Sequence, residues 1–301
     1  MRVWTKEQIE TANLVYHRYE AELYDEGHPE IFASEERRWA DFFDGWDKAR
    51  PAPAVILDIG AGTGFIYGSM EKHLREGDRF IASDLSPEML ELCRKRAQKS
   101  GFLQILVSPA DKLALQDNSV DLITVNSVLH HLPDPSAFLR EASRLLKPGG
   151  ILAIMHEPNL AFAKSWFMRN VARLASRLAM RTDRSIGGQS KKDYSHIYHA
   201  VNQELLERRL IGQPLDARQI QSMVDIHSPT AGGSYEEIGF SLDFFQDHGL
   251  RNWQVESFKT YNFLGKLDPT VRLWRRGLNG ILKMVFPNCG SSFSLVTRKS
   301  V

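Results

Sequence analysis

The feature that most constrains the fold is an apolar run ending in a glycine-rich loop, V-I-L-D-I-G-A-G-T-G-F from Val55 to Phe65. Its first three residues have the unbroken apolar character of a strand buried on both faces of a parallel sheet. Glycines at positions 60, 62 and 64 let the backbone turn tightly and approach a ligand, while the following helix offers its amide hydrogens. The segment predicts a strand, a loop and a helix, and a strand-to-helix turn without a ligand stays open as an alternative.

Strand-like and helix-like segments alternate after this loop. Ligands of parallel sheets bind beyond the carboxyl ends of the strands, where the glycine loop lies. The alternation implies right-handed crossovers, so we predict an α/β fold with a doubly wound, mostly parallel seven-stranded sheet. The predicted strands after the first are 79–83, 103–107, 120–125, 151–155, 253–261 and 291–297, and the predicted helices between them are 86–98 and 136–146.

The same pattern divides the chain into four parts. Residues 1–50 form an N-terminal helical cap, with helices at 6–24 and 34–46, a turn of sequence Y-D-E-G-H-P-E between them and Ser34 as the second N-cap. Residues 51–159 form the ligand-binding core. Residues 160–240 form a helical insertion after the fifth strand, with a break near Gly187-Gly188, which we interpret as a substrate lid. Residues 241–301 complete the sheet and add a basic helical segment.

Composition excludes several classes of protein. Apolar and charged fractions of 43% and 25% are ordinary for a soluble globular chain, and a net charge of +1 gives no reason to expect a nucleic-acid partner. Cys93 and Cys289 provide neither a disulfide framework nor a zinc site. No apolar run approaches the roughly 20 residues of a membrane span, and the N-terminus lacks the apolar core of a signal peptide. We expect a cytoplasmic monomer or homodimer.

The loop also discriminates between cofactors. A nicotinamide dinucleotide fingerprint needs glycine three residues after its second glycine, and Phe65 occupies that position. Asp58, just before the loop, is a poor neighbour for a pyrophosphate and a good partner for a cation. Asp84 lies twenty residues past Gly64, where a carboxylate usually accepts both ribose hydroxyls. These residues favour a nucleoside-like, cationic cofactor.

Five motifs in order resemble the class I S-adenosylmethionine-dependent methyltransferases, and most closely the small-molecule group that includes the ubiquinone and menaquinone methyltransferases. They are L-D-I-G-A-G-T-G, I-A-S-D-L-S-P-E-M-L, S-P-A-D-K-L, V-D-L-I-T-V-N-S-V-L-H-H-L and L-K-P-G-G-I-L, within residues 50–157. The resemblance implies a Rossmann-like methyltransferase fold, S-adenosylmethionine as cofactor, S-adenosylhomocysteine as product, and a small-molecule substrate.

The resemblance also implies residue roles. The loop residues Gly60, Ala61, Gly62 and Gly64 would pass beneath the methionine part of the cofactor, with Asp58 near its ammonium group. Asp84 would bind the ribose. The other implied contacts are Leu85, Met89 and Ala110 at the adenine ring, Asp111 at its amino group, Asn126 and Leu129 beside the sulfonium, and Tyr16 and Tyr24 over the methionine carboxylate.

Catalytic residues are harder to identify, because methyl transfer is an in-line displacement that depends mainly on alignment and on exclusion of water. A proton acceptor is needed only if the nucleophile must lose a proton. The candidates that follow strands or lie in the insertion are His130, His131, His156, Glu157 and His227, and each histidine has a packing or capping role as its alternative. Their spacing is not that of a zinc site, so we expect no metal.

The insertion contains a basic amphipathic segment. An apolar stripe and a basic row share helical spacing, and the pattern repeats near residue 276. We expect the stripes to pack on the domain while the arginines meet water or the acidic cap, and the alternative is contact with an anionic membrane. The residues are Phe167, Val171, Leu174 and Leu178 with Arg169, Arg173, Arg177 and Arg181, and then Leu273, Trp274, Leu278, Ile281 and Leu282 with Arg272, Arg275, Arg276 and Lys283.

Three functions compete. A methyltransferase that acts on an O, N or C atom of a small molecule accounts for all five motifs. A nicotinamide-dependent oxidoreductase on a related sheet is disfavoured by Phe65. A non-catalytic methyltransferase-like partner protein is disfavoured by the intact glycine loop and Asp84.

Overall fold

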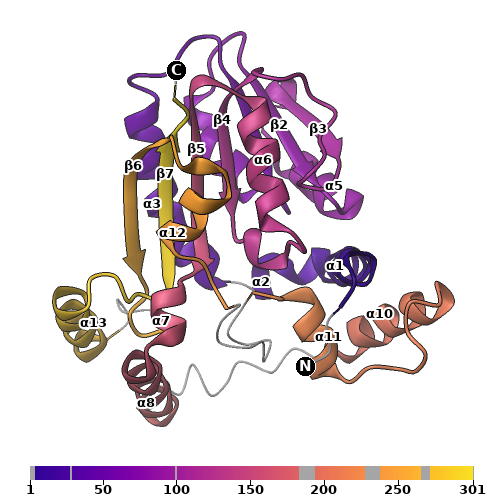
Figure 1. Ribbon diagram of the computed structural model, residues 1–301, viewed down its shortest axis with the longest axis vertical. Helices are drawn as coiled ribbons and strands as arrows, with labels where there is room; N and C mark the ends of the chain where they lie inside the picture. Colours follow the sequence, from indigo (N-terminus) through magenta and orange to yellow (C-terminus); the bar gives the residue numbers. More distant parts are fainter. Residues whose placement is uncertain are drawn as a thin grey trace.

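A single seven-stranded sheet forms the centre of the protein in the computed structural model, which describes residues 4–27, 29–98, 100–182, 194–227, 238–265 and 272–300 (Figure 1). The strand order is β3-β2-β1-β4-β5-β7-β6, with β7 antiparallel to both of its neighbours. This differs from the six-stranded order 3-2-1-4-5-6 by insertion of β7 between the last two strands. The predicted α/β sheet is confirmed. The strands are β1 (Val55–Ile59), β2 (Arg79–Asp84), β3 (Leu103–Val107), β4 (Val120–Asn126), β5 (Leu146–Pro158), β6 (Gln254–Tyr261) and β7 (Ser292–Arg298).

Alternate residues of the strands enter two separate cores, one on each face of the sheet. Leu57 and Ile59 of β1 join the core beneath α6, whereas Ile56 joins the core beneath α3, α4 and α5. Strands buried on both faces carry apolar residues at successive positions, which explains the unbroken apolar runs in the sequence. The helices on these two faces are α3 (Pro29–Trp46), α4 (Phe65–Met70), α5 (Pro87–Arg96), α6 (Pro135–Leu145) and α12 (Leu242–Phe245).

The N-terminal segment differs from its prediction in two places. The predicted turn contains a short helix, α2 (Tyr24–Gly27), and α3 begins at Pro29 rather than after Ser34. Proline is well suited to the first turn of a helix because it lacks the amide hydrogen that would be unsatisfied there. Ser34 therefore lies inside α3 and is not its N-cap.

The glycine loop turns sharply between β1 and α4. Gly60 and Gly64 have φ angles of +68° and +88°. A Cβ atom on Gly60 would lie 2.3 Å from the Val128 side chain, and one on Gly64 would lie 2.8 Å from Cys93 Sγ. Both positions require glycine for conformation and for space.

Two helical regions lie at the carboxyl end of the parallel strands (Figure 1). The first, here called the α1 cluster, combines α1 (Lys6–Glu20) with α10 (Ser195–Glu207) and α11 (Ala217–Val224), whose apolar side chains share one core. The second, here called the α8 pair, combines α8 (Trp166–Thr182) with α13 (Leu273–Val285) around another core, next to the short helix α7 (Leu160–Lys164). The described parts of the insertion thus belong to two regions, and the predicted break near Gly187-Gly188 lies outside the described residues.

The predicted packing of α8 is wrong for three of the four residues of its apolar stripe, and Val171 alone packs on the core as expected. Phe167, Leu174 and Leu178 are 47%, 67% and 46% exposed, although we expected their stripe to face the domain. The buried stripe is Met168, Ala172, Ala175 and Ala179, one position along the helix. The small side chains of this stripe fit against the segment after β6, where a Cβ atom on Gly265 would lie 3.7 Å from that of Ala172. On α13, Arg275 is buried although an exposed arginine was expected there, while Leu273 and Ile281 are exposed.

Candidate functional site

A cavity opens beyond the carboxyl ends of β1, β2 and β4, and α1 forms part of its wall. Most of the lining surface is apolar, and polar side chains from separate elements reach it, as is usual for a small-molecule site. Nine of the cofactor residues expected from the sequence line this cavity: Tyr24, Gly60, Gly62, Asp84, Leu85, Met89, Ala110, Asp111 and Asn126.

Asp84 is fixed at the end of β2 by two backbone amides. Gly62 donates to its Oδ2 at 2.9 Å, and Ser86 donates to its Oδ1 at 2.9 Å. Burial raises the pKa of Asp84, and the hydrogen bonds from these two backbone amides oppose the rise. Each carboxylate oxygen has a second lone pair, so the side chain can still accept two hydroxyl hydrogens.

The floor of the cavity fits a cationic nucleoside. A Cβ atom on Gly62, whose φ is +52°, would meet no atom within 4 Å, so the glycine leaves open space beside Asp84. Asp58 lies below the floor, fully buried, with Oδ1 accepting from Thr124 at 2.8 Å. Its Oδ2 has no hydrogen-bond partner among the described residues. Burial raises the pKa of Asp58 to about 8, and a nearby cation would favour its ionised form.

Asp111 follows β3 in the chain and lines the cavity. Its carboxylate forms an ion pair of 2.6 Å with Lys6 of α1, which joins the N-terminal helix to the cavity rim. Arg18 of α1 likewise pairs with Glu88 of α5 at 2.9 Å. The N-terminal helix is therefore attached to the core through charges at both of its ends.

The other five predicted cofactor residues do not line the cavity. Asp58, Ala61 and Leu129 are buried below its surface, and Gly64 is closed off by Cys93. Tyr16 is buried in the α1 cluster, where its ring stacks on that of Tyr194 at 6.4 Å.

One face of α1 supplies residues that the sequence analysis missed. Glu10, Asn13 and His17 line the cavity, and their spacing of three and four residues places them on one side of a helix. The apolar positions of α1 could have revealed this face, because Ile9, Ala12 and Val15 mark the buried side next to it.

His130 and Glu157 form a rigid pair at the end of β4. The fully buried Glu157 carboxylate accepts from the amides of Val128 and Leu129 at 2.5 and 2.8 Å, and it lies 2.9 Å from His130 Nδ1. These bonds fix the turn that carries both histidines. Neither side chain lines the cavity, so Glu157 is placed to position the turn and not to touch a substrate there.

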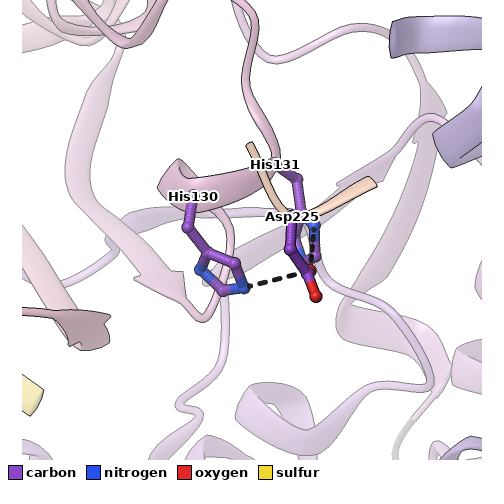
Figure 2. Close-up of side chains that lie close together, drawn as sticks. All are labelled: His130, His131 and Asp225. Atoms are coloured by element: carbon purple, nitrogen blue, oxygen red, sulfur yellow. Dashed lines mark ion pairs between the residues drawn. The ribbon is translucent and has the colours of Figure 1, made fainter. Parts of the chain in front are cut away.

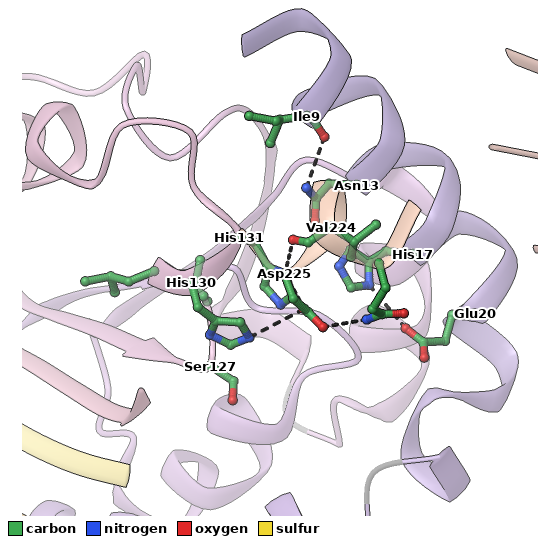
Figure 3. A network of polar contacts seen from close by, with 12 residues as sticks. Ile9, Asn13, His17, Glu20, Ser127, His130, His131, Val224 and Asp225 are labelled. Carbon is green, nitrogen blue, oxygen red and sulfur yellow. Dashed lines mark hydrogen bonds and ion pairs between the residues drawn. The ribbon is translucent and has the colours of Figure 1, made fainter. Parts of the chain in front are cut away.

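His131 lines the cavity and is held by the insertion. Its Nδ1 lies 2.8 Å from the Val224 carbonyl oxygen and 3.2 Å from Asp225 Oδ1, at the end of α11 (Figures 2 and 3). Both partners are acceptors, so Nδ1 carries the proton and Nε2 carries the lone pair. Burial, reinforced by His130, lowers the pKa of His131 to about 3, so the ring is neutral at pH 7.

Asp225 was also missed by the sequence analysis, which selected His227 two residues later. Burial opposes its ionisation, but the neighbouring imidazoles of His131 and His130 hold the pKa of Asp225 below its usual value. The nearby His17 ring meets His131 edge-on at 5.2 Å, so the carboxylate and three imidazoles form one network (Figure 3).

The remaining two candidates have structural partners. The amide of His227 donates to the His130 carbonyl at 3.1 Å, and its Nε2 lies 3.2 Å from the Leu132 carbonyl. His156 Nδ1 lies 2.6 Å from Ser127 Oγ, and its amide donates to the Tyr261 hydroxyl. Neither imidazole lines the cavity.

A metal ion has one plausible set of ligands in the described part of the chain. His130, His131 and Asp225 each place one ligand atom within 4.8 Å of the others (Figure 2). The expected absence of a metal therefore stays a prediction, for which we specify a test below.

Comparison with known proteins identifies the core. Residues 57–154 match the family model described as "Methyltransferase domain". This match covers the glycine loop, Asp84 and the β4 turn. Residues 57–154 are therefore similar to methyltransferase domains, which supports the resemblance to the class I S-adenosylmethionine-dependent methyltransferases. Because the glycine loop lies inside the residues that match the methyltransferase domain, the match argues against a nicotinamide-dependent oxidoreductase.

Curated relatives extend the similarity only over part of the chain. The chain is 37% identical over 121 residues to a ubiquinone biosynthesis O-methyltransferase of Xanthomonas axonopodis pv. citri, which covers 38% of this chain and 49% of that protein. It is 30% identical over 156 residues to the mitochondrial 2-methoxy-6-polyprenyl-1,4-benzoquinol methylase of Caenorhabditis elegans, covering 50% of this chain and 54% of that protein. The chain thus spans about half the length of these methyltransferases.

One solved structure is similar over almost the whole chain. The structure is that of a putative methyltransferase in complex with the Trm112 methyltransferase activator of Haloferax volcanii. The aligned region covers 95% of this chain and 98% of the other chain, with a TM-score of 0.52 and 17% identity. At this identity the similarity describes the fold alone.

Proposed function

We propose that this protein transfers the methyl group of S-adenosylmethionine to a hydroxyl oxygen of a small, largely apolar or aromatic molecule. The methyltransferase domain supports the cofactor, and the named activities of the relatives support a small-molecule acceptor. The observation that carries the choice of a hydroxyl is the position of His131, a neutral imidazole on the cavity wall whose orientation is fixed by Val224 and Asp225.

In this proposal the cofactor lies across Gly60 and Gly62. Asp84 accepts the ribose hydroxyls, and Leu85 and Met89 contact the adenine ring. Asp58 ionises beneath the cationic part of the cofactor, since its unpartnered oxygen then gains an opposite charge nearby. S-adenosylmethionine supplies an electrophilic methyl group on a sulfonium.

The chain's own contribution to the reaction is alignment and proton removal. The acceptor oxygen would take the methyl group in line with the carbon–sulfur bond, whose electron pair would stay on the sulfur of S-adenosylhomocysteine. The oxygen becomes strongly acidic as it gains positive charge, so even an imidazole of low basicity can take its proton. His131 Nε2 receives that proton, and Asp225 stabilises the resulting imidazolium through Nδ1.

Two measurements test this function. Titration calorimetry with S-adenosylhomocysteine tests the cofactor site directly. Mass spectrometry after incubation with S-adenosylmethionine and a panel of phenols tests transfer, with the corresponding methyl ethers as matched controls. We expect methylated phenols and unchanged ethers. A protein that binds no S-adenosylhomocysteine would instead be a non-catalytic methyltransferase-like partner.

A metal chelator separates the two roles open to His131 and Asp225. We expect the activity to survive EDTA treatment, because Nδ1 of His131 already donates to its two acceptors and the ring is placed for proton transfer. An activity that is lost in EDTA and restored by a divalent ion would show that His130, His131 and Asp225 are metal ligands.

A further inference from the structure

Exposed apolar side chains are concentrated on the α8 pair. Thirteen large apolar residues are exposed in the described part of the chain, and eight of them lie on these two helices. A soluble surface normally carries such residues singly, and a group of them indicates an interaction site. The eight are Trp166 (72%), Phe167 (47%), Leu174 (67%), Leu178 (46%), Leu273 (87%), Ile281 (55%), Met284 (77%) and Val285 (56%).

These side chains are not required for the packing of the two helices. The inward faces of α8 and α13 already share a core that includes Met168, Ala172, Ala175 and Leu282. The rings of Phe167 and Phe286 lie 5.3 Å apart, so the start of α8 lies next to the residue that follows α13. Each helix therefore has one apolar face inside the protein and further large apolar side chains outside it.

Only basic charges accompany the exposed apolar residues. The described segments 160–182 and 272–300 contain no aspartate or glutamate. Arg173 and Arg177 are exposed on α8, and Arg276 and Lys283 are exposed on α13. A helix that only faces water would carry both signs of charge and few large apolar residues.

We propose that the outward face of the α8 pair docks on the surface of an anionic lipid bilayer, and this proposal goes beyond the methyl-transfer function and does not depend on it. The charge of this face favours a lipid surface over a second copy of the chain. An anionic bilayer complements a face with basic groups only, whereas the same face of a second copy would repel it. Large apolar side chains with interspersed arginine and lysine are also the composition of helices that lie in the membrane interface.

The two helices would lie in the interface and not cross the bilayer. Among the described helices, none combines the length and apolarity that a membrane span needs. Trp166 at the start of α8 has the amphipathic ring that is enriched at the headgroup level. The α8 pair lies at the same end of the sheet as α1 (Figure 1), and α1 forms part of the cavity wall, so docking would place the lipid surface at the end of the protein that carries the site.

The test is co-sedimentation of the full chain with vesicles of phosphatidylcholine alone or mixed with phosphatidylglycerol. We expect binding to the mixed vesicles that weakens as salt is added. The double variant R173E/R177E should lower the binding constant at least about tenfold, since each basic group near an anionic surface contributes roughly fivefold. The double variant L273Q/M284Q should also weaken binding, because it removes apolar area that enters the acyl boundary.

Matched controls lie on the α1 cluster. Arg218 on α11 and Leu206 on α10 are exposed in the same way, so R218E and L206Q should leave vesicle binding unchanged. Circular dichroism and S-adenosylhomocysteine affinity verify that each variant is folded. A folded wild type that does not sediment with anionic vesicles contradicts the proposal. A wild-type dimer that L273Q/M284Q converts to a monomer, without vesicle binding, would show that the face contacts a second copy instead.

Discussion

The α1 cluster and the α8 pair each combine part of the insertion with a helix from outside it. The α1 cluster buries its large apolar residues, whereas the α8 pair exposes many of them. In the α1 cluster, Ile197, Val201 and Leu205 of α10 are fully buried against α1 and α11. In the α8 pair, Leu174 and Leu178 face outward while alanines face the core. The first arrangement stabilises the cavity wall and supplies His17 and Asp225 to the site. The second leaves an apolar and basic surface, so the two regions serve different purposes.

The largest expected effect is on catalysis and arises in the contact between the α1 cluster and the β4 turn. H131N should lower kcat by about 10²- to 10⁴-fold, because the acceptor loses its proton acceptor. The rate of the wild type should not fall between pH 7 and 5 through His131, since its pKa of about 3 keeps the ring neutral there. Steady-state kinetics measure both. The exposed His199 of α10 offers the control H199N, and equal losses in the two variants would contradict the assignment.

The two helical regions should also differ in their contribution to stability. L205A in the α1 cluster should lower the free energy of unfolding by about 2–5 kcal/mol, because it opens a cavity in a packed core. L174A on α8 should change it by no more than about 0.5 kcal/mol, since the side chain is 67% exposed. Urea denaturation measures both. A large loss for L174A would mean that this face is covered within the folded chain.

Asp84 lies at the end of β2, outside both helical regions, so a change there tests cofactor binding independently of them. D84A should weaken S-adenosylhomocysteine binding roughly 10- to 100-fold, because hydrogen bonds to a charged group are lost. Calorimetry measures the affinity. Unchanged affinity in a folded D84A protein would rule out the ribose assignment.

A pH dependence of stability is expected from Asp58, which also lies outside both helical regions. Its folded-state pKa of about 8 lies above the unfolded value, so its favourable contribution is present below about pH 4 and is lost as the pH rises toward 8. The unliganded protein should lose up to about 1 kcal/mol per pH unit through this group across that window. Urea midpoints at several pH values measure the slope. D58N should flatten it, and an unaltered slope would place the titration elsewhere.

The sequence by itself determined the sheet and the glycine loop and Asp84 at its edge. Strands β1, β2 and β4 are buried on both faces, so each appears in the sequence as a short run of apolar residues. The glycine loop and Asp84 are also recognisable from the sequence, because they follow consecutive strands at a fixed spacing. These features need no information about distant residues. The predicted β3, 103–107, matches the observed strand at both ends.

Only the tertiary structure decided which face of each added helix is buried and which side chains complete the site. Two stripes on α8 have helical spacing, and the choice of the alanine stripe depends on packing against residues far along the chain, among them Phe263, Leu264 and Leu282. Asp225 lies 94 residues after His131 in the chain, and no local pattern joins them. Their contact depends on α11 packing against α1, because long-range contacts are set by packing and not by spacing along the chain.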